Sequence, residues 1–591
     1  MFRLFLIVAT LAALVFAYFW GAQMYALDEK AELWGNQPLF LFVSVLAVIY
    51  FGLASWQINN APRLKALGLS ALSGLLMSAG FVPMPLILGM FVGLVPLLYL
   101  EAYLKPQIGK FYSWLMVYLA FLSWNALCTY WVANSAFSPA LVAITINALL
   151  QTTPYLLWQF SKKYLHEIHA YLVLACAWIA FEYLHLNWDL SWSWLNLGNS
   201  LAHVPALIQW YQWTGVFGGS LWILGANYLI FKTLKRINNN SWNAKTFLKP
   251  SLWLVVPICV SMILKFSFRL DAPNTTYEIL AVQPNYEPHH VKFNKSQIIQ
   301  LEEILTLIRQ NITPQTQAIL LPETTFSGID YNQLALQQNT LLDSLYQLIK
   351  EYPQARIVLG IDAYKILGSN ETPTQNAFKY NDVYIESHNA AIQLDSNPRQ
   401  LAQNYYKKSK LVPGPEIFPF KDFLFFLEPL IKQFGGFPGG LTTQLERTAF
   451  FDKNKTFGIA PVICYESIFG EFCGGYTQKN ANLLAVITND GWWDNTLGHR
   501  QHLHMASLRA IEQRRFVVRA ANSGTSACID PYGNITQQTP YNQATVLKCR
   551  INPQQKITFY ALYGDYLAKI CLFALFAILL STIARKLKKN N

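Results

Sequence analysis

Charged residues are scarce in this sequence. Asp, Glu, Lys and Arg make up 13% of the 591 residues, whereas 53% are hydrophobic. An ordinary soluble domain carries about 25% charged residues, so a wholly soluble or disordered chain is excluded. The deficit is uneven: long apolar stretches repeat before about residue 268, residues 272–555 have an ordinary soluble composition, and one more apolar stretch follows. The composition therefore predicts a membrane part and a soluble part.

Cysteine is also scarce, and it lacks metal-binding spacing. There are eight cysteines, with no CxxC pair and no histidine-rich cluster. This pattern excludes the usual zinc and dithiol redox motifs, so neither a metal nor an organic cofactor is expected. Four cysteines fall in the soluble part, namely Cys464, Cys473, Cys528 and Cys549. In an oxidising compartment Cys473 could pair with Cys528 or Cys549, and the sequence leaves the pairing open.

Long apolar runs, in contrast, are abundant. A helix needs about 20 apolar residues to cross the hydrocarbon core of a bilayer. Ten stretches are candidates: 4–22, 38–57, 67–83, 86–104, 111–133, 140–160, 169–186, 216–234, 252–268 and 562–584. The first could instead be a signal peptide, but Phe16 to Trp20 offers no small-x-small cleavage site, which favours an uncleaved span.

Basic residues predict the orientation of these spans. With the N-terminus inside, the inner loops carry most of the basic residues of the helical part: Arg63, Lys65, Lys105, Lys110, Lys162, Lys163, Lys232, Lys235, Arg236, Lys245 and Lys249. The positive-inside rule then places the soluble part on the outer face, which is the periplasm in a bacterium, and the C-terminal tail in the cytoplasm. The same bias explains the net charge of +12, so nucleic acid is not an expected partner.

Three residues of the soluble part, Glu323, Lys408 and Cys464, adjoin short apolar runs that are typical of buried strands. Glu323 follows residues 318–322, and Cys464 follows residues 458–463. A carboxylate can take the proton of a thiol, and an ammonium can stabilise both a thiolate and an oxyanion. The three residues therefore predict a thiol nucleophile site, placed beside a membrane.

Elsewhere the soluble part alternates between strand-like and helix-like segments. Tyr277 to Gln283 and Leu483 to Thr488 are typical of strands, whereas residues 340–351 and Gln501 to Gln513 are typical of helices. This alternation predicts a layered α/β domain.

The motifs around the three residues resemble the nitrilase superfamily of carbon–nitrogen hydrolases. They are Leu-Pro-Glu-Thr at 321–324, Tyr-Lys-Lys-Ser-Lys-Leu-Val-Pro at 406–413, Ile-Cys-Tyr-Glu at 463–466, Thr-Asn-Asp-Gly-Trp at 488–492 and Arg-Ala-Ala-Asn-Ser-Gly at 519–524. Together with the flanking spans, the chain from about residue 67 onward resembles the bacterial apolipoprotein N-acyltransferase family. The resemblance implies a polytopic α-helical membrane domain and a nitrilase-like αββα sandwich.

This resemblance also implies a division into domains. Residues 1–60 form an extra N-terminal pair of transmembrane helices ahead of the family's usual start. Residues 61–270 form the transmembrane helical domain, and residues 271–556 form the periplasmic nitrilase-like domain. Residues 557–591 form a C-terminal transmembrane helix with a basic cytoplasmic tail.

The resemblance further implies roles for individual residues. Glu323 is the general base, Lys408 stabilises the oxyanion and Cys464 is the nucleophile. Three residues support the site, namely Glu416, Tyr465 and Glu466. The loop at 411–416 reads Leu-Val-Pro-Gly-Pro-Glu where the family usually has Phe-Gly before the glutamate, but Glu416 keeps its spacing of eight from Lys408.

Two aromatic features are candidates for lipid binding. Trp492 and Trp493 either line a lipid pocket or pack in the core. The apolar segment 417–427 is too short and interrupted to span a bilayer, and the glycines at 435–440 would allow it to hinge. We expect it to rest on the outer leaflet as an arm, with Phe423 and Phe426 binding substrate; packing in the core is the alternative.

The resulting functional hypothesis is acyl transfer by a monomer in the inner membrane. A phospholipid donates a fatty acyl chain to Cys464, and the amino group of a diacylated lipoprotein accepts it. The first alternative is a membrane-bound nitrilase-type amidase acting on a small amide, for which ten spans would be excessive. The second is a membrane scaffold without activity, which an intact set of Glu323, Lys408 and Cys464 disfavours.

Overall fold

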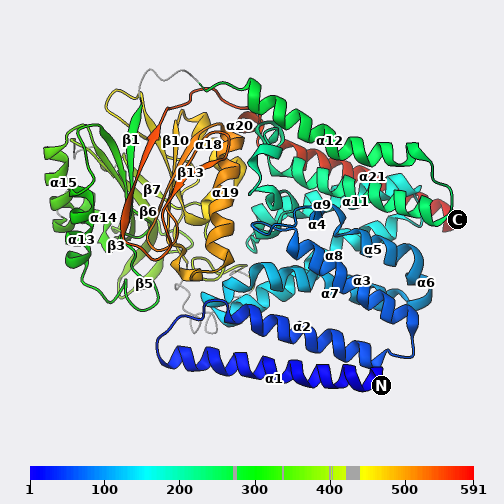
Figure 1. The fold of residues 1–591 in the computed structure, drawn as a ribbon. Helices are drawn as coiled ribbons and strands as arrows, with labels where there is room; N and C mark the ends of the chain where they lie inside the picture. The colour runs from blue at the N-terminus through cyan, green and yellow to red at the C-terminus, as the bar shows by residue number, and fades with distance from the viewer. Residues whose placement is uncertain are drawn as a thin grey trace.

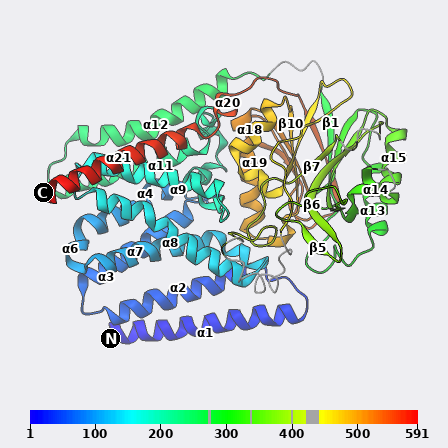
Figure 2. The ribbon, with the colours of Figure 1, turned by 180° about the vertical axis from the view of Figure 1, so that it is seen from behind.

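The computed structural model describes residues 1–270, 276–335, 339–397, 401, 403–420, 423 and 440–590. Figure 1 shows the chain in two parts, a bundle of long helices on one side and layers of sheet and helix on the other. The view from behind in Figure 2 shows the same division. Both chain ends lie at the end of the bundle that is farthest from the sheets (Figure 1).

The helical part consists mainly of long apolar helices. They are α1 (Phe2–Glu29), α2 (Gln37–Trp56), α3 (Ala61–Ala79), α7 (Lys110–Thr129), α8 (Phe137–Ser161), α9 (Glu167–Asn187), α11 (Val216–Asn238), α12 (Ala244–Ser267) and α21 (Tyr566–Asn590). Between α3 and α7 the chain runs through α4 (Leu88–Val92), α5 (Val95–Tyr99), a π-helical turn (Leu100–Leu104) and α6 (Lys105–Ile108). The short α10 (Tyr211–Thr214) precedes α11.

All ten predicted spans fall on helices, and eight of these are long and apolar enough to cross a membrane. The other two, 67–83 and 216–234, overlap α3 and α11. Both helices bury small or polar residues inside the bundle: Ser70 of α3 donates to the carbonyl of Met116 over 2.6 Å, and Asn227 of α11 accepts from the amide of Leu94 over 2.8 Å. Interior helices face protein rather than lipid, so they tolerate a less apolar composition.

The other part is a sandwich of two mixed sheets. Among the described residues the first sheet has eight strands: β14 (Thr545–Ile551), β1 (Tyr277–Gln283), β2 (Thr316–Leu320), β4 (Arg356–Ile366), β6 (Val383–Leu394) and β5 (Phe378–Tyr380) in this order, with β3 (Phe326–Asp330) on β4 and β7 (Tyr405–Lys407) on β6. The second follows the order β13 (Ile535–Gln538), β12 (Ala527–Ile529), β11 (Phe516–Ala521), β10 (Leu483–Thr488), β9 (Gly458–Ile463) and β8 (Phe450–Phe451).

Helices cover both outer faces of the sandwich. On the first sheet lie α13 (Gln297–Arg309), α14 (Tyr331–Ala335) and α15 (Thr340–Glu351), as Figure 1 shows. On the second lie α18 (Gly470–Gln478) and α19 (Leu497–Gln513), and α20 (Phe559–Tyr563) leads back into the bundle. The predicted architecture, a polytopic helical part joined to an αββα sandwich, is confirmed.

Helix α19 joins the two parts, because it lies between the second sheet and the bundle (Figures 1 and 2). The side-chain amide of Gln501 donates to the carbonyl of Cys128 over 3.0 Å, and its oxygen accepts from the indole of Trp131 over 3.2 Å. At the end of α19, Arg514 donates to the side chain of Gln209 over 2.6 Å. These buried contacts hold the sandwich against the ends of the helices.

Candidate functional site

The three residues singled out in the sequence converge at the ends of their strands. Glu323 follows β2, Lys408 follows β7 and Cys464 follows β9. The ammonium of Lys408 lies 3.0 Å from Oε1 of Glu323, and the thiol of Cys464 lies within interaction range of both. All three side chains are buried. The fold therefore brings a carboxylate, an ammonium and a thiol into one site, and their roles stay a prediction.

Glu416 completes the surroundings of Lys408. Its Oε1 lies 2.7 Å from Nζ of Lys408, and its Oε2 accepts from the amide of Val412 over 2.7 Å. The second contact closes the Leu-Val-Pro-Gly-Pro-Glu loop on itself. Lys408 thus sits between two carboxylates, which fixes its ammonium in place.

Asn389 of β6 also belongs to the site, although sequence reasoning missed it. Its amide donates to Oε1 of Glu323 over 2.9 Å and to Oε1 of Glu416 over 3.1 Å. It therefore ties together the two carboxylates that flank Lys408. The only signal in the sequence is one polar residue before the apolar end of a strand, which is too common to single out.

Cys464 occupies a strained turn. Its φ angle of 46° lies in the left-handed region, which a non-glycine residue adopts only when its surroundings require it. The carbonyl of Cys464 lies 3.1 Å from Nε2 of His502, whose Nδ1 lies 3.0 Å from Asp490. Asp490 is also paired with the buried guanidinium of Arg519. This network holds the backbone of the turn from behind. Asp490 and Arg519 lie in two of the sequence motifs, whereas sequence reasoning missed His502.

Electrostatics keep the resting thiol protonated. Burial raises the pKa of Cys464, and the charge of Glu323 raises it further. Burial alone would raise the pKa of Glu323 too, but Lys408 and Asn389 outweigh burial and hold that pKa below its usual range. Burial likewise opposes the charge of Lys408, but Glu323 and Glu416 raise its pKa well above its usual value. The resting site is thus an ion pair of Glu323 and Lys408 beside a neutral thiol.

This charge state predicts a pH profile for the thiol. We expect the rate at which a small soluble reagent alkylates Cys464 to rise steadily to about pH 9, because a raised pKa moves deprotonation above the usual value of about 8.5. The rate is measured by mass spectrometry of the Cys464 peptide, which separates it from the other thiols. A plateau near about pH 7 would contradict the assignment by revealing a resting thiolate.

Glu466 connects the loops that carry Lys408 and Cys464. It accepts from the hydroxyl of Tyr406 over 2.5 Å, from the amide of Ser409 over 2.7 Å and from the amide of Ile463 over 2.8 Å. Burial raises its pKa to about 7. Glu466 thus contacts the residues next to the two reactive groups, which favours the predicted supporting role.

Tyr465 reaches into the helical part. Its hydroxyl donates to the carbonyl of Ser191 over 2.9 Å, and its ring packs against Trp194. The residue after the nucleophile is therefore anchored on the loop between α9 and α10. This contact ties the thiol turn to the bundle.

Beside the thiol, an apolar cavity of about 460 Å³ opens between the two parts of the molecule. Residues of the helical part form one wall, including Trp131, Val142, Trp192 and Trp194. The loop 412–415 of the sandwich forms part of the other wall. Cys464, Tyr465 and Trp493 line it as well. A cavity of this size and character suits a hydrocarbon chain held against the thiol.

The aromatic candidates for lipid binding lie in different places. Trp493 lines this cavity, whereas Trp492 packs against His289 and Phe293 and is not among the lining residues. The lipid-binding role of Trp492 therefore gains no support from its position. In the expected arm, Phe423 is 79% exposed, while Phe426 lies outside the described residues together with most of 421–439.

The cysteine pairing differs from the options considered. Cys528 of β12 forms a disulfide with Cys549 of β14, whereas Cys473 is a buried free thiol. The two cysteines lie on strands of different sheets, so the disulfide links the two sheets of the sandwich covalently. Among the described residues, no group of three or more His, Cys, Asp or Glu side chains is arranged to hold a metal ion.

Known protein families match both parts of the chain. The carbon–nitrogen hydrolase family model matches residues 281–558, and the model of the apolipoprotein N-acyltransferase N-terminal domain matches residues 73–229. Among solved structures, Saccharomyces cerevisiae Nit3 of the nitrilase superfamily covers 48% of this chain and 93% of its own, at 16% identity and a TM-score of 0.34.

Three curated relatives are apolipoprotein N-acyltransferases. The apolipoprotein N-acyltransferase of Chlorobaculum tepidum is 26% identical over 86% of this chain and 95% of its own length. Apolipoprotein N-acyltransferase 1 of Treponema denticola is 26% identical over 72% of this chain and 79% of its own. The Pseudomonas putida enzyme is 38% identical over 30% of this chain and 35% of its own. The chain therefore belongs to the apolipoprotein N-acyltransferase family, as an acyltransferase with a carbon–nitrogen hydrolase domain joined to that family's N-terminal domain.

Proposed function

We propose that this enzyme moves a fatty acyl chain from a membrane phospholipid, through a thioester on Cys464, to the N-terminal amino group of a diacylglyceryl-cysteine lipoprotein. The observation that carries the proposal is the position of the thiol. Cys464 opens on an apolar cavity of about 460 Å³ whose walls come from both the helices and the sandwich. A membrane-bound amidase for small amides would have no use for this cavity, so we favour acyl transfer.

The first half of the reaction makes the thioester. Glu323 takes the proton of Cys464 as its sulfur attacks the ester carbonyl carbon of the phospholipid. The ammonium of Lys408 and the backbone N–H of Tyr465 stabilise the oxyanion. When the carbonyl re-forms, the bond from carbon to the glycerol oxygen breaks, and Glu323 returns its proton to that oxygen. A lysophospholipid leaves, and the acyl chain stays in the cavity as a thioester.

The second half makes the amide. The free amino group of the lipoprotein attacks the thioester carbonyl, and Glu323 takes a proton from the attacking nitrogen. The carbon–sulfur bond then breaks, and the sulfur of Cys464 regains the proton. One site can serve both lipids in turn, because a covalent intermediate splits the exchange of ester for amide into two steps.

The test is to follow both halves by mass. Purified protein given phospholipid alone is expected to gain the mass of one acyl chain on the Cys464 peptide. Adding a diacylated lipopeptide should remove that mass and place it on the peptide's amino group. Release of ammonia from a small amide, with no acyl adduct on Cys464, would support the amidase instead.

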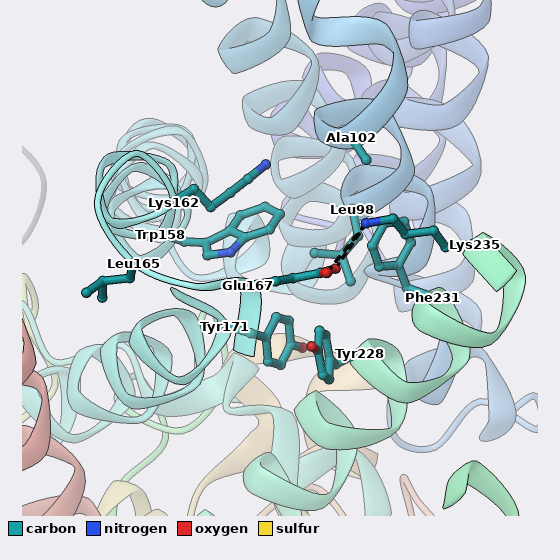
Figure 3. A pocket seen from close by; sticks show the side chains of 10 residues that line it. All are labelled: Leu98, Ala102, Trp158, Lys162, Leu165, Glu167, Tyr171, Tyr228, Phe231 and Lys235. Carbon is teal, nitrogen blue, oxygen red and sulfur yellow. Dashed lines mark hydrogen bonds and ion pairs between the residues drawn. The ribbon is translucent and has the colours of Figure 1, made fainter. Parts of the chain in front are cut away.

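We also propose that the sandwich lies on the periplasmic face of the bacterial inner membrane. The far end of the bundle is basic: Figure 3 shows Lys162 and Lys235 there, around a cavity of about 310 Å³, with Lys235 paired to Glu167. Cytoplasmic helix ends carry such an excess of lysine and arginine. At the opposite end, the disulfide between Cys528 and Cys549 suits an oxidising compartment.

Single introduced cysteines test this topology. An impermeant thiol reagent added outside spheroplasts is expected to label a cysteine at the exposed Lys350 of the sandwich, but not one at Asn240 between α11 and α12. Labelling of position 240 from outside would overturn the orientation and the proposed lipoprotein substrate with it.

A further inference from the structure

A second, smaller cavity of about 170 Å³ adjoins the one that holds the thiol. The walls of the two cavities share six residues, namely Pro139, Ala143, Ser191, Trp192, Pro413 and Gly414. The smaller one extends between α8 and α9, where Asn147 and His185 line it. It therefore lies beside the proposed acyl cavity, between the helices and the loop that carries Pro413, Gly414 and Pro419.

Three lining residues of this cavity have a buried polar atom without a hydrogen-bond partner anywhere in the described chain. The atoms are Nε2 of His185, Nε1 of Trp192 and Oδ1 of Asn147. His185 is 3% exposed and Asn147 is 4% exposed. A buried polar group without a partner is destabilising, and three around one cavity indicate that a ligand supplies the missing partners.

The protonation of His185 follows from its other nitrogen. The indole of Trp188 lies 2.9 Å from Nδ1 of His185. The carbonyl of Leu190 lies farther from the same nitrogen, at 3.3 Å. An indole N–H only donates and makes the shorter contact, so Nδ1 accepts from Trp188, and the neutral ring carries its proton on Nε2. The unpartnered Nε2 is therefore a hydrogen-bond donor, as is Nε1 of Trp192.

Asn147 presents the opposite character. Its amide nitrogen donates to Oδ1 of Asn125 over 2.6 Å, and Asn125 in turn donates to Gln151 over 2.7 Å. These contacts orient Asn147 so that its oxygen is the free atom. The residues that line the cavity thus carry two N–H donors and one acceptor without partners, buried in a wall that is otherwise mostly apolar.

We propose that this cavity binds the glycerol-ester region of a diacyl lipid, with an ester carbonyl accepting from His185 and Trp192. The inference rests on the proposed function, because it supposes that a diacyl lipid brings its ester to Cys464. Two substrates carry this chemistry, namely the phospholipid donor and the diacylglyceryl end of the lipoprotein. Asn147 accepts from an N–H or O–H group elsewhere in the same lipid.

The test compares ester lipids with ether lipids that lack the carbonyl oxygen. Full-length Cys464→Ala protein in detergent is titrated with a diacyl phosphatidylethanolamine and with its dialkyl ether analogue, and bound lipid is measured by native mass spectrometry. A diacylglyceryl lipopeptide and its dialkyl analogue form the second arm. We expect the ester form to bind about three- to tenfold more tightly in at least one arm, which is the worth of one or two hydrogen bonds.

Matched variants assign this preference to the cavity. His185→Phe and Trp192→Phe keep an aromatic ring but remove the donor, so each should reduce the preference, and His185→Gln should restore part of it. His203→Phe is the control, because His203 also has an unpartnered ring nitrogen but lines neither of the two cavities.

Each outcome decides the proposal. If only the phospholipid shows an ester preference, the cavity binds the acyl donor. If only the lipopeptide shows it, the cavity binds the acceptor. If both show it, the cavity binds each lipid in turn. Equal binding of ester and ether in both arms, a preference that survives both Phe variants, or an equal loss in His203→Phe would overturn it. Since Cys464→Ala protein transfers no acyl chain, failure of the thioester route would appear separately, as a missing adduct on the unmodified enzyme.

Discussion

Replacing Cys464 with alanine is expected to abolish both halves of the reaction while leaving the fold intact. The change removes the only atom that can carry the acyl chain, so neither the adduct nor the acylated lipopeptide should form. A thiol-to-methyl change removes little volume and leaves the contact between the Cys464 carbonyl and His502 in place. The measurement is the mass of the lipopeptide product, with thermal unfolding monitored in parallel.

Cys473→Ala provides the matched control. Cys473 is also buried in the sandwich as a free thiol, but it packs near the backbone of Glu466 and does not line the apolar cavity. This variant should keep its activity. Product formation by Cys464→Ala would refute the thioester, and loss of activity in both variants at equal stability would show that the reactive thiol had been misidentified.

Replacing Lys408 with methionine should reduce both turnover and stability. Loss of a preorganised oxyanion stabiliser typically lowers the rate by about 10²–10³. The same change leaves the buried carboxylate of Glu323 and the partly buried carboxylate of Glu416 without their shared cation. Breaking a buried ion pair typically costs about 3–5 kcal/mol. The loss of stability should therefore be observable in denaturant titrations.

Two further variants separate these effects. Glu416→Gln added to Lys408→Met removes one uncompensated charge, so it should recover stability without recovering turnover. Lys407→Met tests a neighbouring lysine that pairs only loosely with Glu386, at 3.8 Å, and it should leave turnover nearly unchanged. A wild-type rate in Lys408→Met would show that Lys408 takes no part in the mechanism. Recovery of turnover in the double variant would show that Lys408 only neutralises the charge of the two carboxylates.

The secondary structure of the soluble part could be predicted because it depends on residues that are neighbours in the chain. The runs that end near Glu323 and Cys464 are buried strands β2 and β9, and the helices predicted at 340–351 and 501–513 are α15 and most of α19. Apolar alternation and strand-bounding Pro and Gly carry this information within a few residues. The same holds for the long helices, whose length is dictated by the bilayer.

The residues of the cavity wall could not be predicted from such local patterns. Trp492 and Trp493 are adjacent in the chain, and only the turn after β10 (Asp490–Trp493) decides that the second one lines the cavity. The pairing of Cys528 with Cys549 depends on which strands of the two sheets face each other. Neither feature leaves a trace in composition or spacing.

By itself, the sequence determined the helical and α/β halves of this protein and the positions of Glu323, Lys408 and Cys464, because strand and span patterns are local and motif residues keep fixed spacings. Tertiary structure alone decided that Asn389 joins Glu323 to Glu416, that His502 supports Cys464 from behind, and that the helices close an apolar cavity over the thiol. These contacts join residues distant in the chain. They exist only once the sheets have paired and α19 has docked on the bundle, since long-range packing fixes positions that local patterns leave free.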